Sequence, residues 1–300
     1  MQRSTYKTGG TVQTTGAVVM KNVLKKHLLL MLGLVNRLSS TKASTHILIF
    51  HDIPPIQINR LEKLIRHLND RYDIIDPVTF TQQFQNKCFS KKKSLLFSFD
   101  DGFYSNYIVA KEILFPLGIR SIFFIPTGFI DCSNREDEIN YINNNIYEEE
   151  SKPDLEIDDM KPMRWEHLSE LLDMGNIIGA HTINHTQLSS IKTNSLMIDE
   201  ITSSGDRIEY MLGSRVDHFA FPFGDINSIN ANALRIASKR YSYVYSGIRG
   251  PNMLDTNNFT IRREPVNVSD DLRYNSLVAS GGLSSYYWRD RIRLDEMIRQ

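Results

Sequence analysis

Residues 94–102 read SLLFSFDDG and place two adjacent carboxylates at the end of an apolar run. The run Ser94–Phe97 predicts a buried strand, and Gly102 predicts a turn directly after it. Side chains alternate along a strand, so Asp100 and Asp101 would ordinarily point to opposite faces, yet both reach one cleft where the backbone bends. One acid could then hold a metal while the other transfers protons. Asp-Asp-Gly is also ordinary surface-turn chemistry, and this stretch alone favours that simpler interpretation.

Length and composition indicate a soluble globular protein. A chain of 300 residues fits one large domain or two ordinary ones, and 41% hydrophobic and 23% charged residues allow a sizeable core. The 35 basic residues balance 35 acidic ones, which argues against nucleic-acid binding through broad electrostatic attraction. Cys88 and Cys132 lack a CxxC spacing, so we expect neither a disulfide framework nor a thiolate metal site.

The N-terminal segment before Thr45 has the charge-then-apolar order of a signal peptide. Lys21, Lys25 and Lys26 precede the apolar run 28–35, but this run is short and no clean small-x-small cleavage site follows it. A basic amphipathic helix that lies on a membrane surface, or packs on the domain, explains the pattern equally well. We favour the non-cleaved helix, and therefore expect a cytoplasmic or membrane-associated protein rather than a secreted one.

From Thr45 onward, apolar strand-like runs alternate with helical patterns. We expect strands at 46–50, 95–99, 121–125, 177–180, 219–221, 243–245 and 259–261. We expect helices over 58–69, 107–117, 165–174 and 231–239, and one that ends before Gly213. Repeated βα units favour a parallel sheet or barrel, in which functional sites lie at the carboxyl ends of the strands.

Residues 131–163 break this rhythm with eleven acidic side chains. A structureless insertion of that length is usually a functional lid or a mobile loop. Its acidity could attract a cationic substrate or a metal, but a solvated, variable insertion is the interpretation that we favour.

A pair of histidines follows the expected strand 177–180. His181 and His185 are four positions apart and can converge on one ion if the chain begins a helical turn after the strand. Such a pair is a weak signal alone, because it also occurs by chance on helix surfaces. Here it lies at the mouth of a βα unit, as the acid pair does. Two histidines and one carboxylate form a three-ligand set that leaves a metal position open for water.

A third segment, FAFPFG at 219–224, again ends a strand in a turn. Pro222 and Gly224 flank Phe223 and fix the local backbone, so the Phe223 N–H could be presented to a substrate oxygen. Taken alone, this segment predicts only a strand and a turn.

Together the three segments resemble the polysaccharide deacetylase family, carbohydrate esterase family 4, whose shared unit is the NodB homology domain. SFDDG at 98–102, HTINH at 181–185 and FAFPFG correspond in order to the family's first three motifs, the third usually being FAYPYG. Trp165–Leu168 is similar to the segment that precedes the second motif in members of this family. The resemblance covers about 45–267 and implies an α/β fold, a distorted, incomplete (β/α) barrel of about seven strands. We therefore divide the chain into a segment 1–44 and a catalytic domain 45–290.

The resemblance also implies roles for individual residues. Asp101, His181 and His185 would bind Zn²⁺ or another divalent ion such as Co²⁺ or Ni²⁺, and Asp100 would be the general base. Such an ion lowers the pKa of water and polarises the acetyl carbonyl, and the Phe223 N–H would help to stabilise the oxyanion.

The general acid departs from the usual family pattern. Most members take a histidine from a Leu-x-His motif near the C-terminus, but no histidine follows His218. Phe50–Ile53 closes the first strand and resembles the Tyr-His-Asp-Ile opening of poly-N-acetylglucosamine deacetylases. This similarity implies that His51 is the general acid, a role that suits histidine at neutral pH. The alternative is a histidine that merely caps a strand.

The third motif also lacks the arginine that many members carry, because Ala220 stands in its place. Arg263 resembles the arginine that FAYPYG-type members bear on a late strand. It could orient Asp100 through a charge-assisted hydrogen bond, although a surface salt bridge is nearly as good an account.

The expected function is metal-dependent hydrolysis of acetyl groups, with an N-acetylated amino sugar of a bacterial-type surface glycan, or its precursor, as substrate. The alternatives are an O-acetyl esterase or amidase and a catalytically silent glycan-binding module. The intact set of acids and histidines argues against the silent module. Tyr286, Tyr287 and Trp288 could stack on sugar rings, with core packing as the default.

Overall fold

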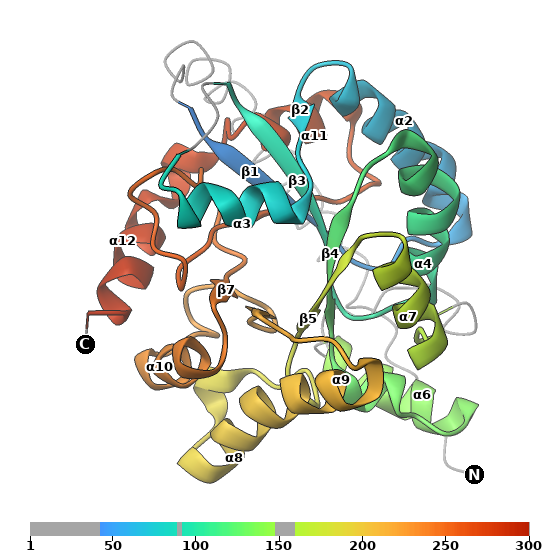
Figure 1. The fold of residues 1–300 in the computed structure, drawn as a ribbon, viewed down its shortest axis with the longest axis vertical. Coiled ribbons are helices and arrows are strands. Elements are labelled where there is room, and N and C mark those ends of the chain that lie inside the picture. The colour runs from blue at the N-terminus through green and yellow to red at the C-terminus, as the bar shows by residue number, and fades with distance from the viewer. Residues whose placement is uncertain (1–42, 89–91, 148–159, 300) are drawn as a thin grey trace, which may run out of the picture.

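The fold is a curved parallel sheet with helices around its outside, seen in a computed structural model that describes residues 43–88, 92–147 and 160–299 (Figure 1). The strands are β1 Thr45–Phe50, β2 Asp73–Ile74, β3 Ser94–Phe99, β4 Ser121–Ile125, β5 Ile177–Ala180, β6 His218–Ala220, β7 Tyr243–Tyr245 and β8 Glu264–Pro265. Seven follow one path in the order β7-β6-β5-β4-β3-β1-β8, and β2 pairs with β3 beside it. All strand pairs are parallel, and among the described strands β7 and β8 do not pair, so the predicted incomplete barrel is confirmed.

The helices of the described residues mostly cover the outer face of this sheet (Figure 1). They are α2 Ile58–Asn69, α3 Pro77–Gln85, α4 Tyr104–Val109, α5 Thr127–Ile130, α6 Arg135–Tyr141, α7 Trp165–Asp173, α8 Asn194–Ile198, α9 Ser204–Leu212, α10 Ala231–Arg240, α11 Leu272–Ala279 and α12 Trp288–Met297. Wider π-helical turns at Ala110–Leu114, Ile142–Ile146 and Asp199–Ser203 extend α4, α6 and α8. The helices expected at 58–69, 165–174 and 231–239 are therefore confirmed.

The apolar core has two layers, because alternate residues of each strand face opposite sides of the sheet. Leu95, Phe97 and Phe99 of β3 pack outward against the helices. Leu96 belongs to the smaller barrel interior, which Phe80 of α3 also enters. Helix α3 thus covers the amino ends of the strands, and the opposite rim is left for chemistry.

The prediction of a strand at 259–261 is wrong. Within it only Ile261 forms an isolated bridge to the sheet, and the edge strand is Glu264–Pro265. The physical reason is a local turn: the Asn257 side chain accepts a hydrogen bond from the Phe259 N–H at 2.8 Å. Such side-chain turns compete with strand pairing.

The acidic insertion is also more ordered than the sequence predicts. Over 131–147 it forms α6 and a π-helical turn rather than a structureless loop. Glu138 of α6 is buried and forms ion pairs with Arg135 and Arg164. Tyr141 stacks on Phe129 of α5 with ring centroids 5.1 Å apart. This part of the insertion is packed on the barrel, and residues 148–159 lie outside the described residues.

The N-terminal segment 1–42 also lies outside the described residues, so its amphipathic helix, its membrane association and the localisation stay predictions. Within the described parts of the chain, no helix has both the length and the apolar character that a membrane span requires. Cys88 and Cys132 are both free thiols.

Candidate active site

The residues predicted from the motifs follow the carboxyl ends of parallel strands. His51 follows β1, Asp100 and Asp101 follow β3, His181 follows β5, and Phe223 lies in the turn after β6. Parallel strands end at the same rim of a barrel, so these side chains are candidates for one site.

The two adjacent acids reach this rim in different ways. Asp100 continues the inward-facing series of Leu96 and Ser98 along β3, and Asp101 would by alternation point outward. Asp101 instead has φ +72°, a left-handed conformation that is rare outside glycine, and Gly102 also has φ +72°. The predicted backbone bend is therefore present, and it turns Asp101 back toward the barrel axis.

Asp101 meets both motif histidines. Its Oδ1 lies 3.5 Å from His181 Nε2 and 3.2 Å from His185 Nε2. One ligand atom from each of the three residues lies within 4.8 Å of the others, and all three side chains are buried. This Oδ1 is a buried oxygen without a hydrogen-bond partner of good geometry among the described residues. Such an orphaned oxygen requires a partner, and a cation would be one.

The other ring nitrogen of each histidine is already engaged. His181 Nδ1 lies 2.8 Å from the Ala220 carbonyl, and His185 Nδ1 lies 2.7 Å from the Asn145 carbonyl. A carbonyl only accepts, so both Nδ1 atoms carry hydrogen and both Nε2 atoms of the neutral rings present a lone pair toward Asp101. Two imidazole nitrogens and one carboxylate form a donor set that fits a divalent ion such as Zn²⁺.

The pKa shifts of Asp101 and His185 show that the space between the three groups favours a positive charge. Burial would raise the pKa of Asp101, but His185 and His181, when protonated, hold it well below its ordinary value. Burial would lower the pKa of His185, but Asp101 raises it overall. The anionic form of Asp101 therefore attracts a proton or a metal ion to the space between the three groups.

The histidine motif is not helical, contrary to the turn expected from its spacing. Residues 181–187 form an irregular loop, and Thr182 and His185 have φ +64° and +52°. Among the described residues, five non-glycine positions have positive φ, and Asp101, Thr182, His185 and Phe223 are four of them. Strained backbone is thus concentrated at this rim, as is common at functional sites.

Asp100 has a separate partner. Arg263 donates to both of its oxygens, with Nη1–Oδ1 at 2.7 Å and Nη2–Oδ2 at 2.9 Å. Both side chains are buried, so the alternative of a surface salt bridge is wrong. The guanidinium lies over the Phe124 ring at 4.9 Å, and its Nε donates to the Ser246 carbonyl. This two-pronged pairing fixes the orientation of the Asp100 carboxylate.

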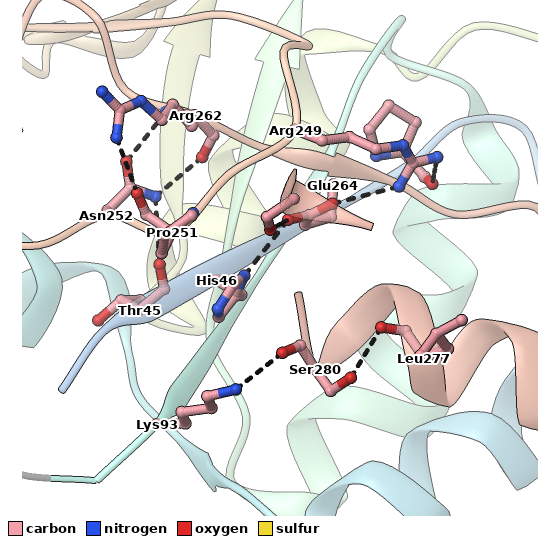
Figure 2. A network of polar contacts seen from close by, with 12 residues as sticks. Thr45, His46, Lys93, Arg249, Pro251, Asn252, Arg262, Glu264, Leu277 and Ser280 are labelled. Carbon is pink, nitrogen blue, oxygen red and sulfur yellow. Dashed lines mark hydrogen bonds and ion pairs between the residues drawn. The ribbon is translucent and has the colours of Figure 1, made fainter. Parts of the chain in front are cut away.

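Polar contacts on the outer face of β8 support Arg263 (Figure 2). Glu264, the next residue, is fully buried and lies 3.3 Å from His46 Nδ1 and 3.2 Å from Arg249 Nη1. The Arg262 N–H donates to the Asn252 side chain, which donates in turn to the Arg262 carbonyl. The residues on both sides of Arg263 are therefore fixed, although β8 itself has only two residues.

Phe223 lies at the mouth of the site. The residue is 40% exposed, and its ring centroid lies 4.8 Å from that of His185. The Gly224 N–H donates to the Pro222 carbonyl at 2.6 Å, which closes a tight turn around Phe223 with φ +61°. A side chain at Gly224 would meet Gly247 N at 2.5 Å, so this turn requires glycine.

His51 is exposed at the end of β1, and its charge lowers the pKa of Asp101 less than the ligand histidines do. It is open to solvent and follows a strand that is parallel to those of the metal ligands, so it lies on the same rim. The aromatic residues proposed for sugar stacking lie around the start of α12, where Tyr286 and Trp288 are exposed and Tyr287 faces Arg249.

Sequence reasoning missed Asn145 and Glu200, which contact the histidine loop. Asn145 acts through its backbone carbonyl, so no side-chain pattern could have identified it. Glu200 is a buried acid in a π-helical turn, and its only signal is a carboxylate on the apolar face of a helix.

Comparison with protein families agrees with these motifs. Residues 89–242 match the family described as polysaccharide deacetylase. This range includes both acids, both histidines and Phe223, but His51 and Arg263 lie outside it. No functionally curated protein matches the sequence significantly.

Solved structures share the fold at low sequence identity. The Streptococcus pyogenes deacetylase PplD has 16% identity and a TM-score of 0.61, covering 78% of this chain and 97% of its own. IcaB from Ammonifex degensii has 17% identity and a TM-score of 0.59, with 81% and 98% covered. A de-N-acetylase from Aggregatibacter actinomycetemcomitans has 16% identity and a TM-score of 0.58, with 76% and 96% covered. At these identities the similarity concerns the fold.

Proposed function

The chain belongs to the polysaccharide deacetylase family, and from this we propose that it hydrolyses acetyl groups on a surface polysaccharide or its precursor in a metal-dependent reaction. We further propose that the scissile group is the N-acetyl of an amino sugar. The observation that carries the proposal is the division of two adjacent acids: Asp101 faces two imidazoles, and Asp100 is held by Arg263. Metal-dependent hydrolysis with a general base needs a metal ligand and a separate base at one place.

In this proposal Asp101, His181 and His185 hold the metal. The donor set suits Zn²⁺, and Co²⁺ or Ni²⁺ would fit the same nitrogen and oxygen ligands. When bound, the ion supplies Lewis acidity, which polarises the acetyl carbonyl and lowers the pKa of water.

Asp100 then acts as the general base and accepts a proton from the attacking water at a carboxylate oxygen. Arg263 holds this carboxylate in a fixed orientation through two hydrogen bonds while the proton is transferred. The Phe223 N–H donates to the carbonyl oxygen as negative charge develops there. His51, exposed at the rim, donates a proton to the departing amine.

The names of the relatives support an acetylated glycan as the substrate class. PplD is described as a deacetylase, and the Aggregatibacter protein as a de-N-acetylase. An O-acetyl ester would be cleaved by the same groups and is the second candidate. A silent glycan-binding module is disfavoured, because a buried Asp100–Arg263 pair beside three metal-ligating groups has no use in binding alone.

The test is acetate release from N-acetylglucosamine oligomers and from O-acetylated glycans by Zn²⁺-loaded protein. We expect release from the N-acetylated oligomers, and loss of that release on treatment with a chelator. Release from the O-acetylated glycans alone would replace the amide substrate with an ester. No release from any glycan, or release that the chelator leaves unchanged, would refute the proposal.

A further inference from the structure

The histidine loop is fixed from behind by a buried carboxylate. Glu200 is only 3% exposed and lies in the π-helical turn Asp199–Ser203. Its Oε2 accepts from the Ile183 and Asn184 backbone N–H groups, both at 3.0 Å. Its Oε1 accepts from the Asn184 side-chain amide at 2.7 Å. All three hydrogen bonds come from Ile183 and Asn184, two of the three residues between His181 and His185.

We propose that Glu200 is a positioning residue of the metal site, which holds the His181–His185 loop in its ligating conformation before an ion binds. The proposal rests on the metal site of the proposed function. It adds to that site a residue that lies outside the sequence motifs and does not contact His181, His185 or Asp101 directly. Glu200 acts through the loop backbone, so it is not a catalytic residue.

The loop needs such support because its conformation is strained. Thr182 and His185 both have positive φ, at +64° and +52°. A non-glycine residue held in such a conformation costs about 1–3 kcal/mol and persists only when its surroundings enforce it. Thr182 and His185 flank the Ile183 and Asn184 amides. The hydrogen bonds from these amides to Glu200 therefore lie where they can offset the conformational cost of the two strained residues.

The helix that carries Glu200 presents a second contact to the same loop. Ser204, four residues later, donates from its hydroxyl to the Thr182 carbonyl at 2.8 Å. The π-helical turn places both side chains on the side that faces the loop, and such turns occur frequently at functional sites. Contacts from α5 complete the enclosure, because the Thr127 and Gly128 N–H groups donate to the Thr182 and Ile183 carbonyls.

Removal of the Glu200 carboxylate would leave two partly buried backbone N–H groups without an acceptor. A donor that loses its acceptor in a partly buried place is costly, so the loop would relax toward conformations in which water reaches these N–H groups more easily. Relaxation at Ile183 and Asn184 changes the separation of the two histidine rings on either side. Zn²⁺ would then have to bring the two rings back into the ligating geometry when it binds. Part of its binding free energy would be used for this, so its affinity would be lower.

The test measures the affinity of the full chain for Zn²⁺ alone, by competition with a chromophoric chelator. We expect Glu200→Ala to weaken Zn²⁺ binding by about 10- to 100-fold, the usual effect of losing a group that orients the metal ligands from outside. Glu200→Gln should lose less, because its remaining carbonyl oxygen can still accept from the two backbone N–H groups. Asn184→Ala, which removes only the side-chain hydrogen bond, provides a milder variant if Glu200→Ala does not fold.

The matched control is Glu264→Gln. Glu264 is also a fully buried carboxylate, but it binds His46 and Arg249 on the outer face of β8 and not the histidine loop (Figure 2). We expect it to lower the unfolding temperature while leaving Zn²⁺ affinity within about twofold of the original chain, since its ion pairs join it to His46 and Arg249 and to none of the three ligating residues.

Each outcome decides the proposal. Unchanged Zn²⁺ affinity in folded Glu200 variants would overturn it and leave the metal site itself intact. Equal weakening in Glu264→Gln would assign the effect to general destabilisation and also overturn it. If the unaltered chain binds no Zn²⁺, the proposed metal site and the role of Glu200 both fail.

Discussion

The left-handed backbone conformation of Asp101 determines which side chains meet at the carboxyl ends of the strands. With φ +72°, Asp101 faces His181 and His185, and Asp100 keeps the inward direction of its strand and meets Arg263. An extended residue at 101 would send the two carboxylates to opposite faces of the sheet. The separate roles of two adjacent acids therefore depend on one bend.

Asp100→Asn tests the assignment of the base. Asparagine keeps the size of the side chain but cannot accept the proton, so acetate release should fall by about 10²- to 10⁴-fold. Zn²⁺ affinity should change little, because Asp100 is not among the three ligating groups. Activity within a few-fold of the original chain, measured at saturating metal, would exclude Asp100 as base.

Arg263→Lys tests the two-pronged contact. Lysine retains the positive charge but offers a single ammonium in place of the planar fork, so the Asp100 carboxylate loses its fixed orientation. We expect kcat for acetate release to fall by roughly tenfold or more, with a smaller change in KM. A change confined to KM would show that Arg263 serves substrate binding and not the base.

At the scale of elements, helix α6 is part of the site and not a solvated insertion. Glu138 ties it to Arg164 at the start of α7, and the π-helical turn that follows α6 supplies the Asn145 carbonyl to His185. The sequence suggested solvation because the segment is rich in acids. The pairing of Glu138 with a residue far along the chain could not be seen in that pattern.

Glu138→Ala should therefore have two effects. Loss of the paired carboxylate should lower the free energy of unfolding by about 1–3 kcal/mol, measured by urea denaturation. Zn²⁺ affinity should fall as well, because the partner of His185 is displaced with the helix. A destabilised variant with unchanged Zn²⁺ affinity would show that α6 is not coupled to the metal site.

Elements with strong periodicity could be predicted from the sequence. Helix α2 and strands β4, β5 and β7 have the expected bounds, because their apolar spacing matches a face that is buried. Prediction failed where local hydrogen bonds decide the backbone, as at Asn257. In the site, motif residues were identified by type and spacing, but the support from Glu200 and from the Asn145 carbonyl depends on tertiary contacts.

At the scale of the whole molecule, the barrel interior makes stability depend on pH. His218 of β6 is buried, its Nδ1 lies 2.8 Å from the Tyr245 hydroxyl, and it stacks on Tyr243. Burial lowers its pKa from 6.5 to about 4, against a smaller opposing effect of Asp217. The unfolded chain therefore binds a proton at this histidine more readily than the folded chain does between pH 6.5 and pH 4.

The sign follows from this difference: the contribution of neutral His218 to stability is present above about pH 6.5 and is lost as the pH falls toward 4. We expect a loss of about 2 kcal/mol in unfolding free energy between pH 7 and pH 5 from this group. His218→Gln, which leaves the Tyr245 hydroxyl a partner, should flatten the dependence by that amount in denaturation at the two pH values. An identical dependence in both proteins would contradict the prediction.

The central claim is that metal held by Asp101, His181 and His185 enables acetyl hydrolysis with Asp100 as base. The most direct measurement is acetate release from N-acetylglucosamine oligomers by chain stripped of metal and then titrated with Zn²⁺. The account predicts no release from the stripped chain, recovery that saturates at one equivalent of Zn²⁺, and no recovery in His181→Ala. Full release from the stripped chain, or equal recovery in His181→Ala, would contradict it.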